Sequence, residues 1–120
     1  MDELTIVTRE LGDGVVLLEL EGFVDAHTFL ELERKMAELF AADRYKLALD
    51  VTRLGYLGSA GAGSLIHNLT IAREKGGDLV LVGLRKNISI HDVLSLLGQV
   101  HHFTIVDTVP EALAAFQEPP

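Results

Sequence analysis

The chain has 120 residues, enough for a single domain spanning residues 1–120 with a core of its own. Its 18 acidic and 10 basic residues give a formal net charge of −8, which argues against binding to nucleic acid or to an anionic membrane surface. The absence of cysteine excludes disulfides, thiolate nucleophiles and zinc–thiolate sites. The acidic N-terminus is unlike a signal peptide and no apolar run is long enough to span a bilayer, so we expect a cytoplasmic protein without membrane insertion.

The N-terminal residues predict a β-hairpin. Two strand-like runs, 4–10 and 15–22, flank Asp13-Gly14, a pair that supplies the positive φ angles of a tight turn. In the second run one face stays apolar, while the other face becomes acidic towards the end. We therefore expect two antiparallel strands with one face against the core.

A helix and a buried strand follow the hairpin. Apolar residues recur at three- and four-residue steps over 26–42, which predicts an amphipathic helix, and the Asp25 carboxylate can cap its first turn. Residues 45–51 are apolar at the centre, as in a strand buried on both faces. Asp50 near its end is expected to accept N–H groups of residues 52–55.

The rest of the chain alternates helices and strands. A glycine-rich loop, 52–61, leads into a helix that stops at Gly76-Gly77. The remaining predicted elements are a strand over 79–83, a helix over 87–98, a strand over 103–107 and a helix over 109–117. This order predicts an α/β fold: a mixed β-sheet of about four to five strands, parallel after the hairpin, with helices packed mainly on one side. The glycine-rich loop is then expected at the rim where functional loops gather.

The glycine-rich stretch GYLGSAGAG can be compared with three known site motifs. A P-loop needs lysine where Ser64 stands, and a dinucleotide fingerprint needs glycine where Ile66 stands. A nucleophile elbow around Ser59 has its first glycine displaced by one, although Asp92 and His101 follow in the chain order of a hydrolase triad. We therefore predict no cofactor, no catalytic residue and no enzymatic activity, with ester hydrolysis as a third hypothesis behind two binding functions.

Ser59 at the start of a helix remains the candidate. Its hydroxyl is expected to cap the helix, where unpaired N–H groups and the helix dipole would also stabilise a phosphoryl group. A phosphate there adds about two negative charges to a surface of small residues that a partner can approach closely. These small residues are Ala60, Gly61, Ala62 and Gly63. The alternative is a plain serine cap, with glycines that serve loop geometry and helix packing.

The histidines give no metal site. None of the five pairs at the i, i+4 spacing of a helical metal site, and adjacent histidines on a strand point apart. The five are His27, His67, His91, His101 and His102. We expect ordinary surface or core histidines and no metal.

Four segments, taken in order, resemble the STAS domain family, which includes bacterial anti-sigma-factor antagonists and the cytoplasmic tails of sulfate transporters. LELEGFVDAHTFLELERKM is similar to the family's Gly-x-x-Asp-x-x-Thr entry to the first helix, and LALDVTRLGYLGSAGAGSLI to its strand, loop and Asp-Ser-Ser-Gly helix start. GGDLVLVGL is similar to its Gly-Gly strand and VDTVPEALAAF to its C-terminal helix. The resemblance covers nearly the whole chain and implies the STAS fold.

The resemblance also implies site residues. Ser59 falls on the serine that is phosphorylated in the family, Ala60 on the second serine and Gly61 on the motif glycine. Asp25 falls on the acidic position near the phosphorylation site that joins the partner contact. The motif aspartate is replaced here by Gly58. The residues expected to contact a partner are Asp25, Thr28, Gly58, Ala60, Gly61, Ala62 and Gly63.

The family's function supplies the expected partners. Its antagonists bind an anti-sigma factor, often a serine kinase, and so release the sigma factor; the kinase phosphorylates the motif serine and a phosphatase resets it. The resemblance implies such a bacterial regulatory protein, a monomer or weak dimer, with binding switched by phosphorylation of Ser59. The alternative is a STAS subunit of a phospholipid-trafficking ABC transporter complex that binds an ATPase without phosphorylation.

Overall fold

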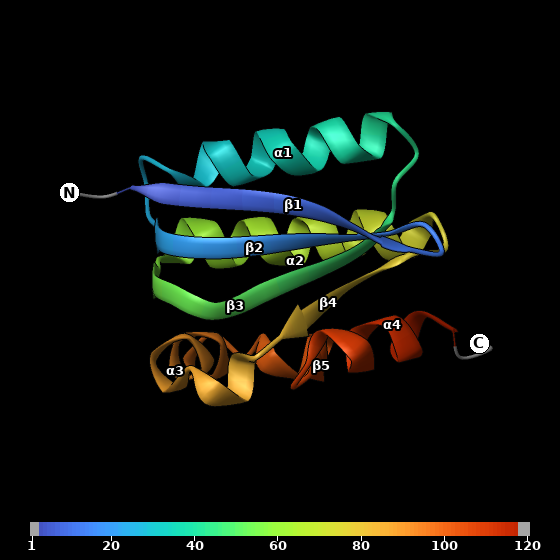
Figure 1. Ribbon diagram of the computed structural model, residues 1–120. Coiled ribbons are helices and arrows are strands. Elements are labelled where there is room, and N and C mark those ends of the chain that lie inside the picture. The colour runs from blue at the N-terminus through green and yellow to red at the C-terminus, as the bar shows by residue number, and fades with distance from the viewer. Residues whose placement is uncertain (1–2, 118–120) are drawn as a thin grey trace.

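The computed structural model describes residues 3–117 and forms a five-stranded sheet with four α-helices (Figure 1). Residues 1, 2 and 118–120 of the expected domain lie outside the described residues. The strands are β1 (Leu4–Gly12), β2 (Val15–Val24), β3 (Lys46–Leu57), β4 (Asp78–Val82) and β5 (Thr104–Val106). The helices are α1 (Phe29–Ala41), α2 (Ser59–Glu74), α3 (Ile88–Leu96) and α4 (Val109–Gln117), with short 3₁₀ turns η1 (Leu84–Lys86) and η2 (Val100–His102).

The sheet is mixed, as predicted. Its strand order is β1-β2-β3-β4-β5; β1 and β2 are antiparallel and the other neighbours are parallel. Asp13 (φ 54°) and Gly14 (φ 79°) turn the hairpin with the positive φ angles expected of this pair. Each later strand follows a helix, and this connection gives parallel neighbours.

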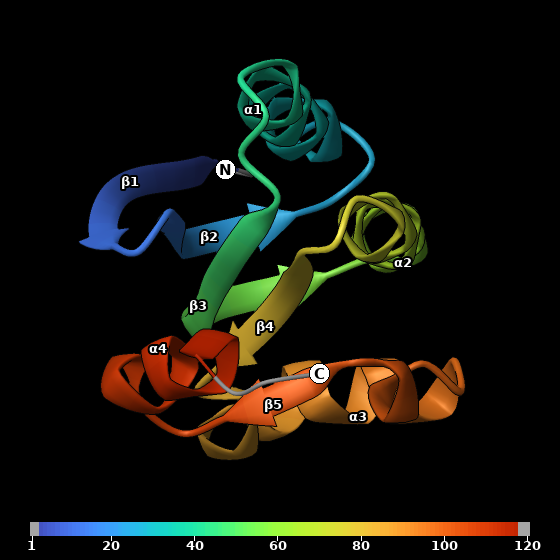
Figure 2. The same ribbon diagram turned by 90° about the vertical axis from the view of Figure 1, so that its right-hand side faces the viewer.

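Helices cover the two faces of the sheet unequally. Helices α1, α2 and α3 pack on one face through a core that includes Leu32, Leu65 and Leu94. Helix α4 packs on the other face, where its Ala112 lies against Leu17 and neighbouring strand residues. Figure 2 shows α1 and α2 on one side of the strands and α4 on the opposite side. The prediction of helices mainly on one side is confirmed.

The prediction of a loop over 52–61 was wrong, because β3 continues to Leu57. Its pairing with β2 extends to the pair Val24–Leu57, beyond the point where β4 ends. The Asn87 amide group holds this extension, since its Nδ2 donates to the carbonyls of Val51 (2.9 Å) and Leu54 (2.7 Å). Only Gly58 separates β3 from α2, so the glycine-rich stretch is half strand and half helix.

Two helices are shorter than the sequence predicted. Helix α1 begins at Phe29 rather than at 26, because the residues after Asp25 form a turn first. Helix α3 begins at Ile88, and the Asn87 side chain caps it by accepting the N–H of Ile90. Helix α4 has the predicted bounds.

Candidate functional site

The candidate site lies where β2 leads into α1 and β3 leads into α2. Both connections are at the same end of the sheet (Figure 1). The N–H of Gly58 donates to the carbonyl of Val24 at 2.9 Å, which joins the two connections directly. Asp25 follows Val24 and Ser59 follows Gly58, so the fold brings the predicted acidic position and the predicted serine onto adjacent segments.

Asp25 and Thr28 shape the first connection. Asp25 Oδ1 accepts the N–H groups of His27 (2.8 Å) and Thr28 (3.0 Å), so it caps the turn that precedes α1. The prediction that it caps the helix itself was wrong, because α1 begins at Phe29 and its cap position, Thr28, makes no side-chain capping hydrogen bond. The Thr28 hydroxyl donates to the Phe23 carbonyl at 2.6 Å. Thr28 is only 3% exposed, so it positions this turn from inside rather than offering a contact surface.

Ser59 is the first residue of α2, and the prediction that its hydroxyl caps the helix was wrong. The cap position is Gly58, with extended φ and ψ of −83° and 173°, and it has no side chain to make a capping hydrogen bond. A serine cap at position 59 requires the helix to begin at residue 60, whereas α2 begins one residue earlier, at Ser59 itself. The Ser59 side chain is exposed, beside the first N–H groups of the helix, which lack a side-chain cap.

The small residues of α2 divide into two rows. Gly61 and Ala62 are buried against the sheet. A Cβ on Gly61 would lie 2.5 Å from Val24 Cγ1 and 2.8 Å from Leu57 Cδ1, so the glycine permits close helix–strand packing. Ala60 and Gly63 are exposed beside Ser59, and a Cβ on Gly63 would meet nothing within 4 Å. Only the outward row, Ser59, Ala60 and Gly63, is open to a partner.

Gly58 lies beneath an aromatic ring that the sequence reading did not single out. A Cβ added at Gly58 would lie 3.3 Å from Cε2 and 3.4 Å from the hydroxyl oxygen of Tyr56. Tyr56 is 51% exposed and pairs across the strands with Phe23, which is 37% exposed. The signal was present in the sequence: Phe23 continues the alternation of outward residues along β2, and Tyr56 takes the same face once β3 is extended.

The positions of three other candidate side chains, Asp50, Asp92 and His101, can be given. Asp50 Oδ1 accepts the N–H of Thr52 at 3.0 Å, as predicted. Asp92 lies on α3 and His101 in η2.

Across residues 3–117, no three His, Cys, Asp or Glu side chains gather in a group that could hold a metal ion. Over the same residues, every helix is too short or too polar to cross a bilayer.

Comparison of the sequence and comparison of the structure with known proteins both find anti-sigma-factor antagonists. BtrV of Bordetella bronchiseptica is 27% identical over 111 residues, which are 92% of this chain and 94% of BtrV. RsfB of Mycobacterium tuberculosis, an anti-sigma-F factor antagonist, is 27% identical over 113 residues, 93% of this chain and 88% of RsfB. Unphosphorylated SpoIIAA, an anti-sigma factor antagonist from Bacillus, shares the fold with a TM-score of 0.78 at 17% identity, covering 92% of this chain and 95% of SpoIIAA.

The STAS domain family matches residues 7–112, which include most of β1, all of β2 to β5 and the first turn of α4. The match therefore spans both connections of the candidate site. The chain belongs to the STAS domain family.

Proposed function

We propose that the protein is an anti-sigma-factor antagonist that binds a serine-kinase anti-sigma factor through the outward row of α2, and that phosphorylation of Ser59 switches this binding off. The observation that carries the proposal is the exposed Ser59 at the first position of α2, next to the small residues Ala60 and Gly63 and on a segment hydrogen-bonded to the one that holds Asp25. A phosphatase completes the cycle, and the protein acts in the cytoplasm as a monomer or weak dimer without catalysing a reaction.

The relatives support this assignment. RsfB is an anti-sigma-F factor antagonist, and SpoIIAA, which has the same fold, exists in phosphorylated and unphosphorylated forms. By the family motif, Ser59 is expected to take the place of the phosphorylated serine, and it is exposed at the start of α2. Regulation by one phosphate is consistent with this arrangement.

The electrostatics of the switch follow from the geometry. The first N–H groups of α2 and the positive end of its dipole stabilise a phosphoryl group on Ser59. The same group places about two negative charges beside a surface that a partner must contact closely. The phosphate is therefore compatible with the fold and unfavourable for the complex.

The first experiment incubates the protein with ATP and, one at a time, the serine-kinase anti-sigma factors of the same organism, followed by mass spectrometry. We expect one phosphate on Ser59 and none on Ser59→Ala. Ser89→Ala is the matched control, because Ser89 is an exposed serine in the first turn of α3. A phosphate on Ser89, or none on the protein with any of these kinases, contradicts the proposal.

A second candidate function rests on Gly58. The family motif has an aspartate there, and without this carboxylate α2 can bind an ATPase that does not phosphorylate Ser59. The protein would then be the STAS subunit of a phospholipid-trafficking ABC transporter complex. Co-purification with a transporter ATPase, with Ser59 unmodified and neighbouring permease and ATPase genes, would favour this function. A neighbouring kinase and sigma factor would favour the first.

A further inference from the structure

Helix α4 leaves part of one sheet face uncovered. Along β2 the residues on this face change from the buried Leu17 under α4 to the half-buried Glu19 and the exposed Glu21 and Phe23. We name the uncovered part of β1, β2 and β3 the open sheet face. Its charged and large apolar residues are Val7, Arg9, Glu19, Glu21, Phe23, Asp50, Arg53 and Tyr56. Two hollows lie on it, one of about 450 Å³ over its charged part and one of about 390 Å³ beside Phe23 and Tyr56.

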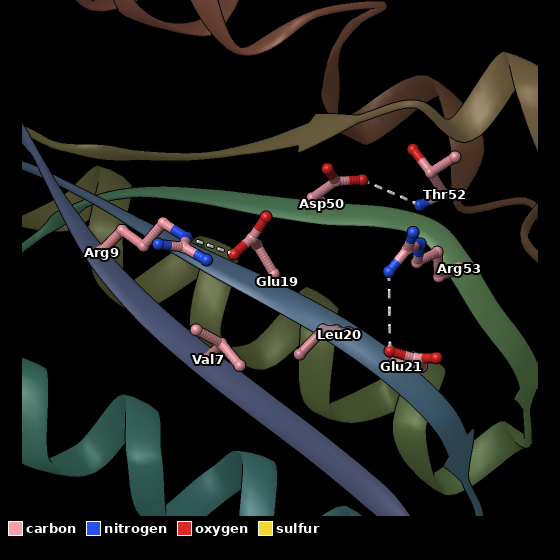
Figure 3. A pocket seen from close by; sticks show the side chains of 8 residues that line it. All are labelled: Val7, Arg9, Glu19, Leu20, Glu21, Asp50, Thr52 and Arg53. Carbon is pink, nitrogen blue, oxygen red and sulfur yellow. Dashed lines mark hydrogen bonds and ion pairs between the residues drawn. The ribbon is translucent and has the colours of Figure 1, made fainter.

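The charged part of this face has more carboxylates than cations. Arg9 is paired with Glu19 at 2.6 Å, and Arg53 lies 3.9 Å from Glu21 (Figure 3). Asp50 adds a third carboxylate, so both guanidinium groups already face acidic partners and the face keeps a net negative charge. The whole chain carries −8, and its first 50 residues, which supply β1, β2 and the start of β3, hold 12 of the 18 acidic residues. A cationic partner is therefore attracted to this face.

Two glycines allow the aromatic side chains of this face to lie close to the main chain. A Cβ on Gly55 would lie 2.9 Å from Cε1 of Phe23, and one on Gly58 would contact the Tyr56 ring at 3.3 Å. The two rings therefore lie close over the main chain, on neighbouring strands, and line the smaller hollow together with Asp25. Exposed aromatic rings in a negative surrounding bind a guanidinium group by cation–π attraction and stacking.

We propose that the open sheet face is a second docking surface, which takes a basic segment of a partner protein with an arginine seated on Phe23 and Tyr56. This surface is on the sheet, whereas the Ser59 surface is on α2, and the inference holds whether or not Ser59 is phosphorylated. Charge selects the partner's basic segment, and the two rings give preference to arginine over lysine. The surface adds contact area beside the Ser59 site, because Tyr56 also covers Gly58.

The test uses synthetic five-residue peptides on the full chain, followed by nuclear magnetic resonance of the backbone amides. A peptide that alternates arginine and valine is expected to shift the signals of Phe23, Gly55 and Tyr56. A lysine–valine peptide should bind more weakly, and a glutamate–valine peptide should cause no shifts. Shifts spread over all acidic regions, equal binding of the glutamate peptide, or no shift on the open sheet face overturns the proposal.

Variants distinguish the contribution of the aromatic rings to peptide binding from that of the overall negative charge. Tyr56→Ser should raise the Kd of the arginine peptide about tenfold, while Tyr56→Phe keeps the ring and the affinity. Ile88→Ser is the matched control, because Ile88 is 75% exposed on α3, outside the open sheet face. Unchanged affinity of Tyr56→Ser contradicts the proposal, as does dimerisation of the free protein through this face. Ser59→Asp should still bind the peptide, so failure of the phosphorylation switch is distinguished from failure of this inference.

Discussion

The two rows of small residues at the start of α2 are alike in side-chain size but have opposite roles. Gly61 faces Val24 and Leu57 at the ends of β2 and β3, where a single added carbon has no room, and Ala62 is buried in the same core. Gly63, two residues later, faces solvent, and an added carbon meets nothing. Small residues in one row serve packing, whereas in the other row they leave a surface that a partner can approach. Residue type alone does not distinguish the two rows; the position of each residue around the helix axis does.

The largest expected effect comes from adding bulk to the outward row. Gly63→Arg should weaken binding of the anti-sigma factor about a hundredfold, because a long side chain would stand where the partner approaches. The fold should tolerate it, since arginine favours a helix by about 0.8–1 kcal/mol over glycine. Isothermal titration calorimetry and thermal unfolding check both expectations, with Gly63→Ala as the small control. Full affinity in Gly63→Arg would remove the outward row from the interface.

The inward row should show the opposite behaviour. Gly61→Ala should lower the free energy of unfolding by about 1–3 kcal/mol, because its Cβ overlaps Val24 and Leu57. Urea denaturation measures this loss, and Gly63→Ala again provides the matched substitution, with an expected gain in stability. If Gly61→Ala were as stable as the original protein, the close helix–strand packing described here would be wrong.

The smallest effect concerns an ion pair away from both rows. Arg44 Nη2 donates to Glu10 Oε1 at 2.6 Å and Nη1 donates to Oε2 at 3.1 Å. The hydrogen bonds from Arg44 lower the pKa of the Glu10 carboxyl below its ordinary value of 4.5. Because the folded-state pKa is lowered, the pair stabilises the protein above pH 4.5, and this contribution is lost as the pH falls through the lowered value.

Glu10→Gln should therefore lower the Tm slightly at pH 7, with the difference from the original protein disappearing well below pH 4.5. Thermal unfolding across this pH range measures it. Anti-sigma factor binding should stay unchanged, because Glu10 and Arg44 lie outside both rows of α2. A Tm difference that is constant with pH would show that the ion pair is not its cause.

Much of the fold was predictable from local pattern. Asp13-Gly14 predicts the hairpin turn, and the alternation of strands and helices predicts a mixed sheet. The extension of β3 was not predictable in this way, since its residues 52–57 include a glycine and the polar side chains of Thr52 and Arg53. It depends on pairing with β2 and on the Asn87 amide, which is more than 30 residues away along the chain. Long-range contacts of this kind override local propensity.

The location of the candidate site was predicted from the sequence, but its cap position and the burial of its side chains were not. The fold brings Ser59 and Asp25 onto adjacent segments, while the cap position falls on Gly58, because α2 begins at Ser59 and not at residue 60. Thr28 is buried because its hydroxyl bonds the Phe23 carbonyl. The pairing of Tyr56 with Phe23 was not predicted, because it depends on the register of β2 against β3.

The central claim is that one phosphate on Ser59 switches partner binding. The most direct measurement compares the affinity of the anti-sigma factor for the unmodified protein and for protein with phosphoserine incorporated at position 59 during translation. We predict a loss of at least about a hundredfold, corresponding to about 2.7 kcal/mol. Equal affinity of the two forms would contradict the account.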